Sequence, residues 1–326
     1  MKIAVLGAGA WGSALSISFS AHHEVTLWSR KRADCDALAR DRESRYLPGA
    51  KLPGAVRIEP DLAAAVGDAQ LLVVATSTSG LRDVCHAVAG IVQGPPMLWA
   101  CKGFETATRE LPHQVVAQAM PRAHQVAALS GPSFALEVAR GLPAALVCAS
   151  HDARFAADMA AKLNSSRLRI YSSADVVGVE LGGALKNVIA IAAGISDGLE
   201  LGRNARAALV TRGLAEVSRL GVAMGGKPET FAGLAGLGDL VLTCTGELSR
   251  NREVGVRLAQ GKALETVLAE LGHVSEGVAS ARAALDHAQA MKVEMPITAA
   301  VCAVLFEGRA PRDAVQQLLA RDPRSE

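Results

Sequence analysis

The stretch that decides the fold is residues 2–12, KIAVLGAGAWG. Its first five residues predict a short buried strand, and the next six follow the spacing G-x-G-x-x-G. In that spacing Gly7 permits a tight turn, Gly9 lets the backbone approach a pyrophosphate, and Gly12 lets a helix pack closely on the strand. The N-terminus of that helix offers N–H groups and a partial positive charge to an anion. We therefore expect a dinucleotide-binding turn here.

A second strand is expected at Glu24–Trp28, and this context favours nucleotide binding over a purely structural glycine turn. Strand-like runs separated by helical patterns continue to about Tyr171. The alternation predicts a doubly wound α/β domain of Rossmann type, with a parallel sheet covered on both faces. The further expected strands are Leu71–Ala75, Met97–Ala100, Gln125–Leu129 and Ala144–Ala149, and the expected helices are Ala33–Arg40, Gly80–Ile91 and Leu111–Ala119.

The character of the chain changes after residue 175. Apolar residues such as Leu181, Leu185 and Val188 recur there at helical spacing, and clear strand patterns are missing. We therefore expect a dinucleotide-binding domain over residues 1–177 and an all-helical domain over residues 178–326. The length of 326 residues agrees with two domains of roughly 150 residues each.

Composition argues against several classes of protein. The chain is 50% hydrophobic with a formal net charge of +2, which argues against disorder and gives no support for nucleic acid as a partner. No apolar run approaches the roughly 18 residues of a membrane span, and the longest candidate is Met295–Phe306. Six scattered cysteines and one adjacent pair, His22-His23, indicate neither a disulfide framework nor a metal site. A cytoplasmic protein with reduced thiols follows.

The residues after the second expected strand bear on the choice of dinucleotide. Sites for NAD usually place an acid there, which binds the ribose 2′-hydroxyl. This chain has Arg30 and Lys31 instead, whose charges suit a 2′-phosphate. The alternative interpretation is a solvated charge run. The pattern favours NADP as the cofactor, with NAD as the other candidate.

Two lysines lie in unusual settings for chemistry. Lys102 follows the apolar run at Met97–Ala100, and strand ends of such sheets face a ligand crevice. Lys186 lies in an otherwise apolar helix, where desolvation would suit it to proton transfer. The alternative for Lys186 is a side chain that extends from the helix edge into water.

Two further segments carry polar groups that could bind a ligand. The run Ser249-Arg250-Asn251 stands at an expected helix start and suits a phosphate-monoester clamp. An ordinary Ser N-cap with solvated arginines is the alternative. The run from Gly131 to Ser133 follows an expected strand and could lie over the cofactor, or it could be only a turn that contains a proline.

Seven motifs in order cover nearly the whole chain: GAGAWG, ACKGFE, SGPSFALE, GGALKNVIAIAAGISDG, GLAGLGDLVLTCT, LSRNR and VSEG. Together they resemble those of bacterial NAD(P)-dependent glycerol-3-phosphate dehydrogenase. The resemblance implies a Rossmann domain followed by an all-helical substrate-binding domain. It also implies reversible reduction of dihydroxyacetone phosphate, a phosphorylated triose, to sn-glycerol 3-phosphate for phospholipid synthesis. The Ala-rich helices are compatible with a homodimer and with a monomer.

The resemblance implies roles residue by residue. Lys186 falls on the proton-transferring lysine, and Lys102 on a lysine that touches both substrate and cofactor. Three residues would orient Lys186 or the substrate hydroxyl: Asn187, Asp239 and Thr243. The implied substrate contacts also include Gly131, Ser133, Asp239, Ser249, Arg250 and Asn251. The implied cofactor contacts are Gly7, Gly9, Ala10, Trp11, Gly12, Arg30, Lys31, Tyr46, Lys102, Ala135, Arg250, Val274 and Glu276.

Two other functions remain open at this point. A reductase of 2-keto or β-hydroxy acids would combine a similar cofactor domain with a helical domain that carries Lys and Asn, but it would bind a carboxylate. A non-catalytic NADP-binding sensor or scaffold would have no need for Lys186, Asp239 and Asn251 together.

Overall fold

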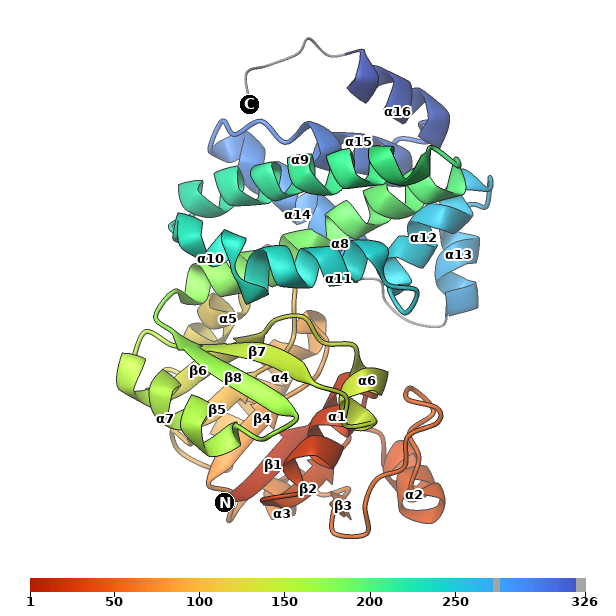
Figure 1. Ribbon diagram of the computed structural model, residues 1–326. Helices are drawn as coiled ribbons and strands as arrows, with labels where there is room; N and C mark the ends of the chain where they lie inside the picture. Colours follow the sequence, from red (N-terminus) through yellow and green to blue (C-terminus); the bar gives the residue numbers. More distant parts are fainter. Residues whose placement is uncertain (272–275, 321–326) are drawn as a thin grey trace. The chain divides into compact units, whose positions relative to one another are not determined.

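The computed structural model describes residues 1–271 and 276–320. Contacts divide the chain into two compact units, Met1–Val179 (unit 1) and Glu180–Glu326 (unit 2). Unit 1 is built from strands and helices, whereas the described residues of unit 2 form helices and turns (Figure 1). The expected Rossmann-type domain followed by an all-α domain is therefore confirmed.

One sheet organises unit 1, which is described throughout. Its eight strands are β1 (Lys2–Leu6), β2 (Glu24–Trp28), β3 (Arg57–Glu59), β4 (Leu71–Val74), β5 (Met97–Trp99), β6 (Val126–Ser130), β7 (Ala144–Ala149) and β8 (Leu168–Ser173). Their order across the sheet is β3-β2-β1-β4-β5-β6-β7-β8. The strand order reverses at β1, so the crevice beyond the carboxyl end of β1 is where such sheets bind ligands.

Helices cover the sheet of unit 1. They are α1 (Ala10–Phe19), α2 (Arg32–Asp41), α3 (Leu62–Val66), α4 (Thr78–Ala89), α5 (Pro112–Ala119), α6 (Ala135–Ala139) and α7 (Ala153–Leu163). Alternate residues of β1 point to opposite faces, and Ile3 and Val5 join one core cluster with Leu15 of α1 and Phe155 of α7. Leu6, on the opposite face of β1, is fully buried as well, so both faces of the sheet are covered, as the apolar strands predict.

The expectation of an entirely parallel sheet is wrong at one position, because β7 runs antiparallel to β6. Residues 131–143 connect these strands and contain only the five-residue helix α6. A parallel return needs a crossover that carries a helix across the sheet. Instead, α6 lies beside α1 (Figure 1), with Val138 and Ala14 in one core cluster, and the chain re-enters the sheet at the end where it left.

Unit 2 is built around one long helix. The helices are α8 (Val176–Gly198), α9 (Gly202–Ala223), α10 (Pro228–Ala232), the π-helical turn η1 (Leu234–Gly238), α11 (Asp239–Thr245), α12 (Arg250–Ala259), α13 (Leu264–Leu271), α14 (Glu276–Ala290), α15 (Pro296–Phe306) and α16 (Pro311–Leu319). Every residue from 178 to 196 in α8 is buried. The first residues of α8 still belong to unit 1 by contacts.

The helix α8 corrects the expectation that Met295–Phe306 is the longest apolar stretch. By length and composition alone, α8 could cross a membrane, but 94% of its most apolar 18-residue window is buried inside the protein. Glu180 and Lys186 interrupt the apolar run in the sequence, although the average over the window remains apolar. Burial on all sides is typical of the core helix of a bundle.

Candidate active site

The glycine turn between β1 and α1 has the geometry that its spacing predicts. Gly7 has φ +121°, and a Cβ placed on it would lie 2.8 Å from the carbonyl oxygen of Ala75. A Cβ on Gly12 would lie 1.8 Å from the carbonyl oxygen of Gly7, whereas a Cβ on Gly9 would meet open space. Gly7 and Gly12 are thus required by the turn itself, and Gly9 leaves its outer side open to a ligand.

Hydrogen-bond donors gather at the N-terminus of α1. The first helical bond runs from the N–H of Ser13 to the oxygen of Gly9, at 3.0 Å, so the N–H groups of Ala10, Trp11 and Gly12 have no intrahelical acceptor. The indole Nε1 of Trp11 is buried and has no partner among the described residues. Donors of this kind around an open glycine fit the pyrophosphate of a dinucleotide.

The residues expected at the ribose end lie at the surface of unit 1. The guanidinium of Arg30 is 3.7 Å from the carboxylate of Asp83 in α4, with both side chains more than 70% exposed. Lys31 is the exposed residue that precedes α2. An exposed ion pair of this kind is weak, so Arg30 can exchange Asp83 for another anion.

A small cavity connects Tyr46 with the glycine turn. The hydroxyl of Ser44 donates to the carbonyl oxygen of Ala8 at 3.2 Å and so holds the segment before Tyr46 beside the turn. Ala8, Ser44 and Tyr46 line a cavity of about 330 Å³. Ser44 was not among the expected residues, because one serine in a polar loop gives no distinct sequence signal.

Lys102, Gly131 and Ser133 meet at one carbonyl oxygen. The ammonium of Lys102 donates to the carbonyl of Gly131 at 2.9 Å, and the hydroxyl of Ser133 donates to the same oxygen at 3.0 Å. Gly131 has φ +136°, which favours glycine. Ala135 begins α6 and packs with Ala10 and Trp11 of α1. The structure thus brings these sequence-predicted residues of unit 1 to the carboxyl-end side of the sheet.

Two residues of this region were missed from the sequence. The hydroxyls of Thr76 and Thr78 are buried and have no partner among the described residues. They follow β4, which pairs with β1, and the backbone of Ala75 and Thr76 lies against Gly7. Polar residues directly after an apolar strand, at a sheet edge that binds ligands, are the signal that could have found them.

Lys186 and Asp239 form a buried ion pair in unit 2. Nζ of Lys186 donates to Oδ1 of Asp239 at 2.5 Å, and the two side chains are 10% and 1% exposed. A close approach of backbones allows this contact, because a Cβ on Gly182, one turn before Lys186, would lie 2.3 Å from the oxygen of Ala235 in η1. Lys186 is therefore paired rather than merely surrounded by apolar side chains, which removes the cost of an isolated buried charge.

A second set of polar contacts begins at Asn187, the residue after Lys186. Nδ2 of Asn251 donates to Oδ1 of Asn187 at 2.9 Å, and Oδ1 of Asn251 accepts from the N–H of Gly277 at 3.2 Å. Asn251 therefore joins α8, α12 and the start of α14. Glu276 is the first residue of α14, and Val274 lies outside the described residues.

The remaining expected residues of unit 2 are distributed around these contacts. The hydroxyl of Thr243 donates to the carbonyl oxygen of Asp239 at 2.6 Å, one helical turn away. The hydroxyl of Ser249 accepts from the N–H of Arg252 at 3.3 Å, so Ser249 caps α12. Arg250 follows it as the first helical residue and is exposed. A basic residue at the start of a helix fits a phosphate group.

The Arg252 side chain, which the sequence did not single out, fixes the start of α12. Its Nε donates to Oδ2 of Asp197 in α8 at 2.6 Å, and Arg206 of α9 donates to the same carboxylate. A Cβ on Gly194 would lie 1.9 Å from the carbonyl oxygen of Arg252, so α8 and α12 pack closely. The described residues hold no cluster of three or more His, Cys, Asp or Glu that could bind a metal ion.

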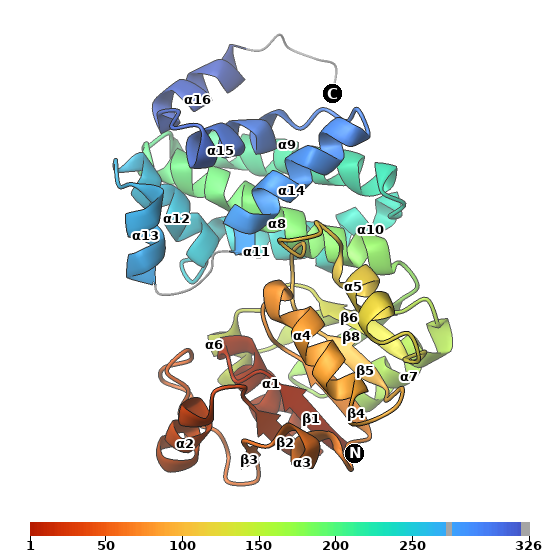
Figure 2. The same cartoon turned by 180° about the vertical axis from the view of Figure 1, so that it is seen from behind.

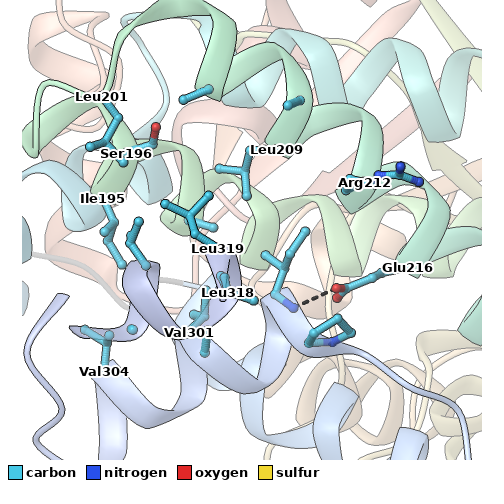
Figure 3. A pocket seen from close by; sticks show the side chains of 18 of the residues that line it. Ile195, Ser196, Leu201, Leu209, Arg212, Glu216, Val301, Val304, Leu318 and Leu319 are labelled. Carbon is cyan, nitrogen blue, oxygen red and sulfur yellow. Dashed lines mark hydrogen bonds between the residues drawn. The ribbon is translucent and has the colours of Figure 1, made fainter. Parts of the chain in front are cut away.

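A cavity of unit 2 has none of the predicted site residues in its lining (Figure 3). It has a volume of about 590 Å³ and is lined mainly by apolar side chains of α8, α9, α15 and α16. At its border the buried carboxylate of Glu216 accepts from the backbone N–H of Ile297 at 2.6 Å, at the start of α15. Burial raises the pKa of Glu216 above its ordinary value. Glu216 therefore stabilises a helix start and is not part of the predicted site.

Comparisons with known proteins agree with this geometry. Family models of the N-terminal and C-terminal parts of NAD-dependent glycerol-3-phosphate dehydrogenase match residues 2–156 and 175–316. The chain is 55% identical to a glycerol-3-phosphate dehydrogenase (NAD(P)+) of Thiobacillus denitrificans and 56% identical to one of Burkholderia lata, each over 100% of both chains. A crystal structure of glycerol-3-phosphate dehydrogenase from Coxiella burnetii matches with a TM-score of 0.94 and 40% identity, over 98% of this chain and 99% of that chain. The chain therefore belongs to the NAD-dependent glycerol-3-phosphate dehydrogenase family.

Proposed function

We propose that this chain reversibly reduces dihydroxyacetone phosphate to sn-glycerol 3-phosphate with NAD(P)H, and that its residues divide this work between the two units. The reaction is that of the family to which the chain belongs. Two observations support the residue assignment: the buried Lys186–Asp239 pair, and the hydrogen bond between Asn187, the next residue of α8, and Asn251 of α12. The groups that we assign to proton donation and to phosphate binding thus belong to one unit.

The cofactor is assigned to unit 1. The N–H groups at the start of α1 would hold its pyrophosphate, and Gly9 would leave room for it. Arg30 and Lys31 would bind a 2′-phosphate, so NADP is the cofactor we propose, with NAD as the alternative. When bound, the nicotinamide supplies the hydride for the carbonyl carbon of the substrate.

Lys186 is the proposed proton donor. Reduction builds negative charge on the carbonyl oxygen, and an ammonium beside that oxygen stabilises the charge and donates a proton. In the reverse direction the neutral amine accepts the proton from the substrate hydroxyl. Asp239 holds Nζ of Lys186 at 2.5 Å and balances its buried charge. Thr243 lies one helical turn after Asp239, and Asn187 directly follows Lys186. Both are assigned to orienting the reacting groups.

The start of α12 is the proposed phosphate site. Arg250, with the backbone donors after Ser249, would bind the phosphate end of the triose. Asn251 already donates to Asn187, so it would couple the phosphate site to the helix that carries Lys186. In unit 1, Lys102, Gly131 and Ser133 are assigned to further substrate contacts, and Lys102 also to the cofactor. Fixing both ends of a small substrate lowers the entropic cost of reaction.

The cellular setting is also a proposal. All six cysteines are buried thiols, which suits the reducing cytoplasm. Supply of phospholipid synthesis is the role that the proposed reaction would serve. A homodimer is the assembly we propose, because Leu201 and Leu319 are large apolar side chains that unit 2 leaves exposed. Sedimentation of the purified protein would give the mass of a dimer, and the mass of a monomer at all concentrations would contradict this assembly.

The test of function is NADPH oxidation by the purified protein. Dihydroxyacetone phosphate is expected to support turnover, and 2-keto acids without a phosphate are expected to support none. Turnover with the keto acids alone would assign the chain to a carboxylate-specific reductase. NADPH binding without turnover on any of these compounds would contradict an enzymatic role.

A further inference from the structure

A partly buried ion pair in unit 1 reaches the loop that carries Lys102. The guanidinium of Arg82 in α4 donates two parallel bonds to the carboxylate of Glu105, from Nε at 2.8 Å and from Nη2 at 2.7 Å. The side chain of Glu105 is only 7% exposed and that of Arg82 is 24% exposed. Paired bonds of this geometry fix the orientation of the carboxylate as well as its distance.

The same guanidinium joins the loop to two helices. It donates to Gln118 of α5 at 3.0 Å and to the carboxylate of Glu110 at 3.0 Å, and Gln118 donates to Glu110 at 2.6 Å. α4 and α5 lie side by side in unit 1 (Figure 2), and residues 100–111 connect β5 to α5. Arg82 is therefore the common partner of the helices and the loop.

Glu105 organises the loop from within. Its carboxylate also accepts from the hydroxyl of Thr108 at 2.6 Å, its N–H donates to the oxygen of Glu110, and its own carbonyl accepts from the N–H of Arg109. The Arg82 guanidinium holds the pKa of the Glu105 carboxyl below its ordinary value. The ionised side chain of Glu105 thus anchors the loop, because its contacts run either to other residues of the loop or to Arg82 of α4.

The path from this anchor to Lys102 is short and buried. Only Gly103 and Phe104 lie between Glu105 and Lys102, and both are buried. Gly103 has φ +127°, a conformation that glycine adopts without strain and other residues disfavour, so it lets the chain turn between Lys102 and the anchor. At the other end of the path, Nζ of Lys102 donates to the carbonyl of Gly131.

We propose that Arg82 and Glu105 are a positioning pair for Lys102, which they hold at the Gly131 carbonyl without touching substrate or cofactor themselves. The inference rests on the role proposed above for Lys102. A buried ion pair is a poor source of net stability, because desolvation of both charges offsets their attraction. Its geometric precision is what a catalytic loop requires.

The test is a double-mutant cycle that combines Arg82→Lys with Lys102→Ala. Lysine keeps the charge at position 82 but cannot form the two parallel bonds. With dihydroxyacetone phosphate and NADPH, Arg82→Lys is expected to lower kcat/KM about tenfold in the wild-type background and less than about twofold in the Lys102→Ala background. An equal loss in both backgrounds would mean that Arg82 acts on the fold in general and would overturn the proposal.

A second measurement on the ligand-free protein needs no turnover. Hydrogen exchange of the N–H groups of Glu105 and Arg109 is expected to speed up in Arg82→Lys, while exchange in α7 stays unchanged. Unchanged exchange in the loop would contradict the proposal, even if the wild-type protein failed to reduce dihydroxyacetone phosphate. Failure of the wild-type enzyme with that substrate, together with faster loop exchange, would overturn the proposed function alone.

Two further variants test whether the effect is specific to the Arg82–Glu105 pair. Glu105→Gln keeps the shape of the side chain and is expected to reproduce the kinetic pattern of Arg82→Lys, so a wild-type kcat/KM would overturn the pairing. Arg57→Lys is the matched control, because Arg57 donates to Thr26 and Ala64 elsewhere in unit 1. Its kcat/KM is expected to stay within about twofold of the wild type, and a tenfold loss there would remove the specificity of the Arg82 effect.

Discussion

The glycine turn of unit 1 and the Lys186–Asp239 pair of unit 2 are built in opposite ways. The turn uses backbone groups within six residues, from Gly7 to Gly12. It forms because Gly7 and Gly12 have no Cβ that would clash with the neighbouring backbone. The pair joins two side chains that are 53 residues apart in the chain and come together only because α8 packs against η1. A site made of backbone groups therefore depends on there being room for the backbone to pack closely. A site made of side chains depends on whether each buried charge keeps its partner.

The largest effect is expected when the side-chain site loses one of its charges. Asp239→Ala removes the carboxylate that lies 2.5 Å from the buried ammonium of Lys186, which is expected to lower the free energy of unfolding by about 3–5 kcal/mol. Denaturant unfolding measures this change. Asp158→Ala, which breaks a half-exposed pair with Lys162, is the matched control and is expected to cost less than about 1 kcal/mol. Equal costs for the two variants would contradict the difference in burial on which the comparison rests.

The backbone site is expected to respond to added atoms instead. Gly12→Ala places a Cβ against the oxygen of Gly7 and is expected to weaken NADPH binding about tenfold to a hundredfold and to lower the Tm. Gly9→Ala adds its Cβ in open space and is expected to weaken binding without lowering the Tm. Gly54→Ala, also in open space but outside the turn, is the control for both measurements. Wild-type NADPH affinity in Gly9→Ala would show that the cofactor does not approach this glycine.

A smaller effect is expected at the edge of the backbone site, where side chains choose between the two dinucleotides. Arg30→Asp is expected to lower the preference for NADPH over NADH by about tenfold or more, because it replaces an attraction to the 2′-phosphate with a repulsion. The ratio of kcat/KM values for the two cofactors measures the preference. Arg40→Asp, at an exposed position of α2, is expected to leave the ratio unchanged. An unchanged ratio in Arg30→Asp would remove Arg30 from the cofactor site.

The smallest effect concerns another buried carboxylate of unit 2. Burial raises the pKa of Glu216 above its ordinary value of 4.5, so the folded protein holds this proton to a higher pH than the unfolded chain. Stability that the protonated form contributes is therefore lost as the pH rises from 4.5 through the raised pKa. The unfolding free energy of the wild type minus that of Glu216→Gln is expected to decrease as the pH rises over this range. Glu265→Gln, at an exposed position, should show a flat difference, and a flat line for Glu216 would contradict the assignment.

The same comparison explains how much of the fold could be predicted. The strands β1, β2, β4 and β5 and the glycine turn were predictable because each depends on a local apolar run or spacing. β3 was missed because its three residues, RIE, contain no apolar run, and β8 because its alternation of buried and exposed residues covers only Leu168 to Tyr171 before two serines. The direction of β7 could not be read from its own residues, because it depends on the short connection that precedes it.

The candidate site shows the same limit. Lys186, Asp239 and Asn251 were named from the sequence, but their pairing required the contact between α8, η1 and α12. The positioning pair of Arg82 and Glu105 was not found, because each is one charged residue in a mixed segment and nothing local marks them as partners. Sequence patterns thus named candidate residues but did not show which of these residues contact one another.

The most direct test of the account is the double variant Lys186→Met/Asp239→Asn, which removes both buried charges together and so leaves none unpaired. Its Kd for NADPH, measured by fluorescence titration, is expected to stay within about twofold of the wild type, because the cofactor is assigned to unit 1. Its kcat with dihydroxyacetone phosphate is expected to fall by about a thousandfold or more, because the proton donor is gone. Wild-type turnover in this variant, or a loss of NADPH binding as large as the loss of turnover, would contradict the division of work between the two units.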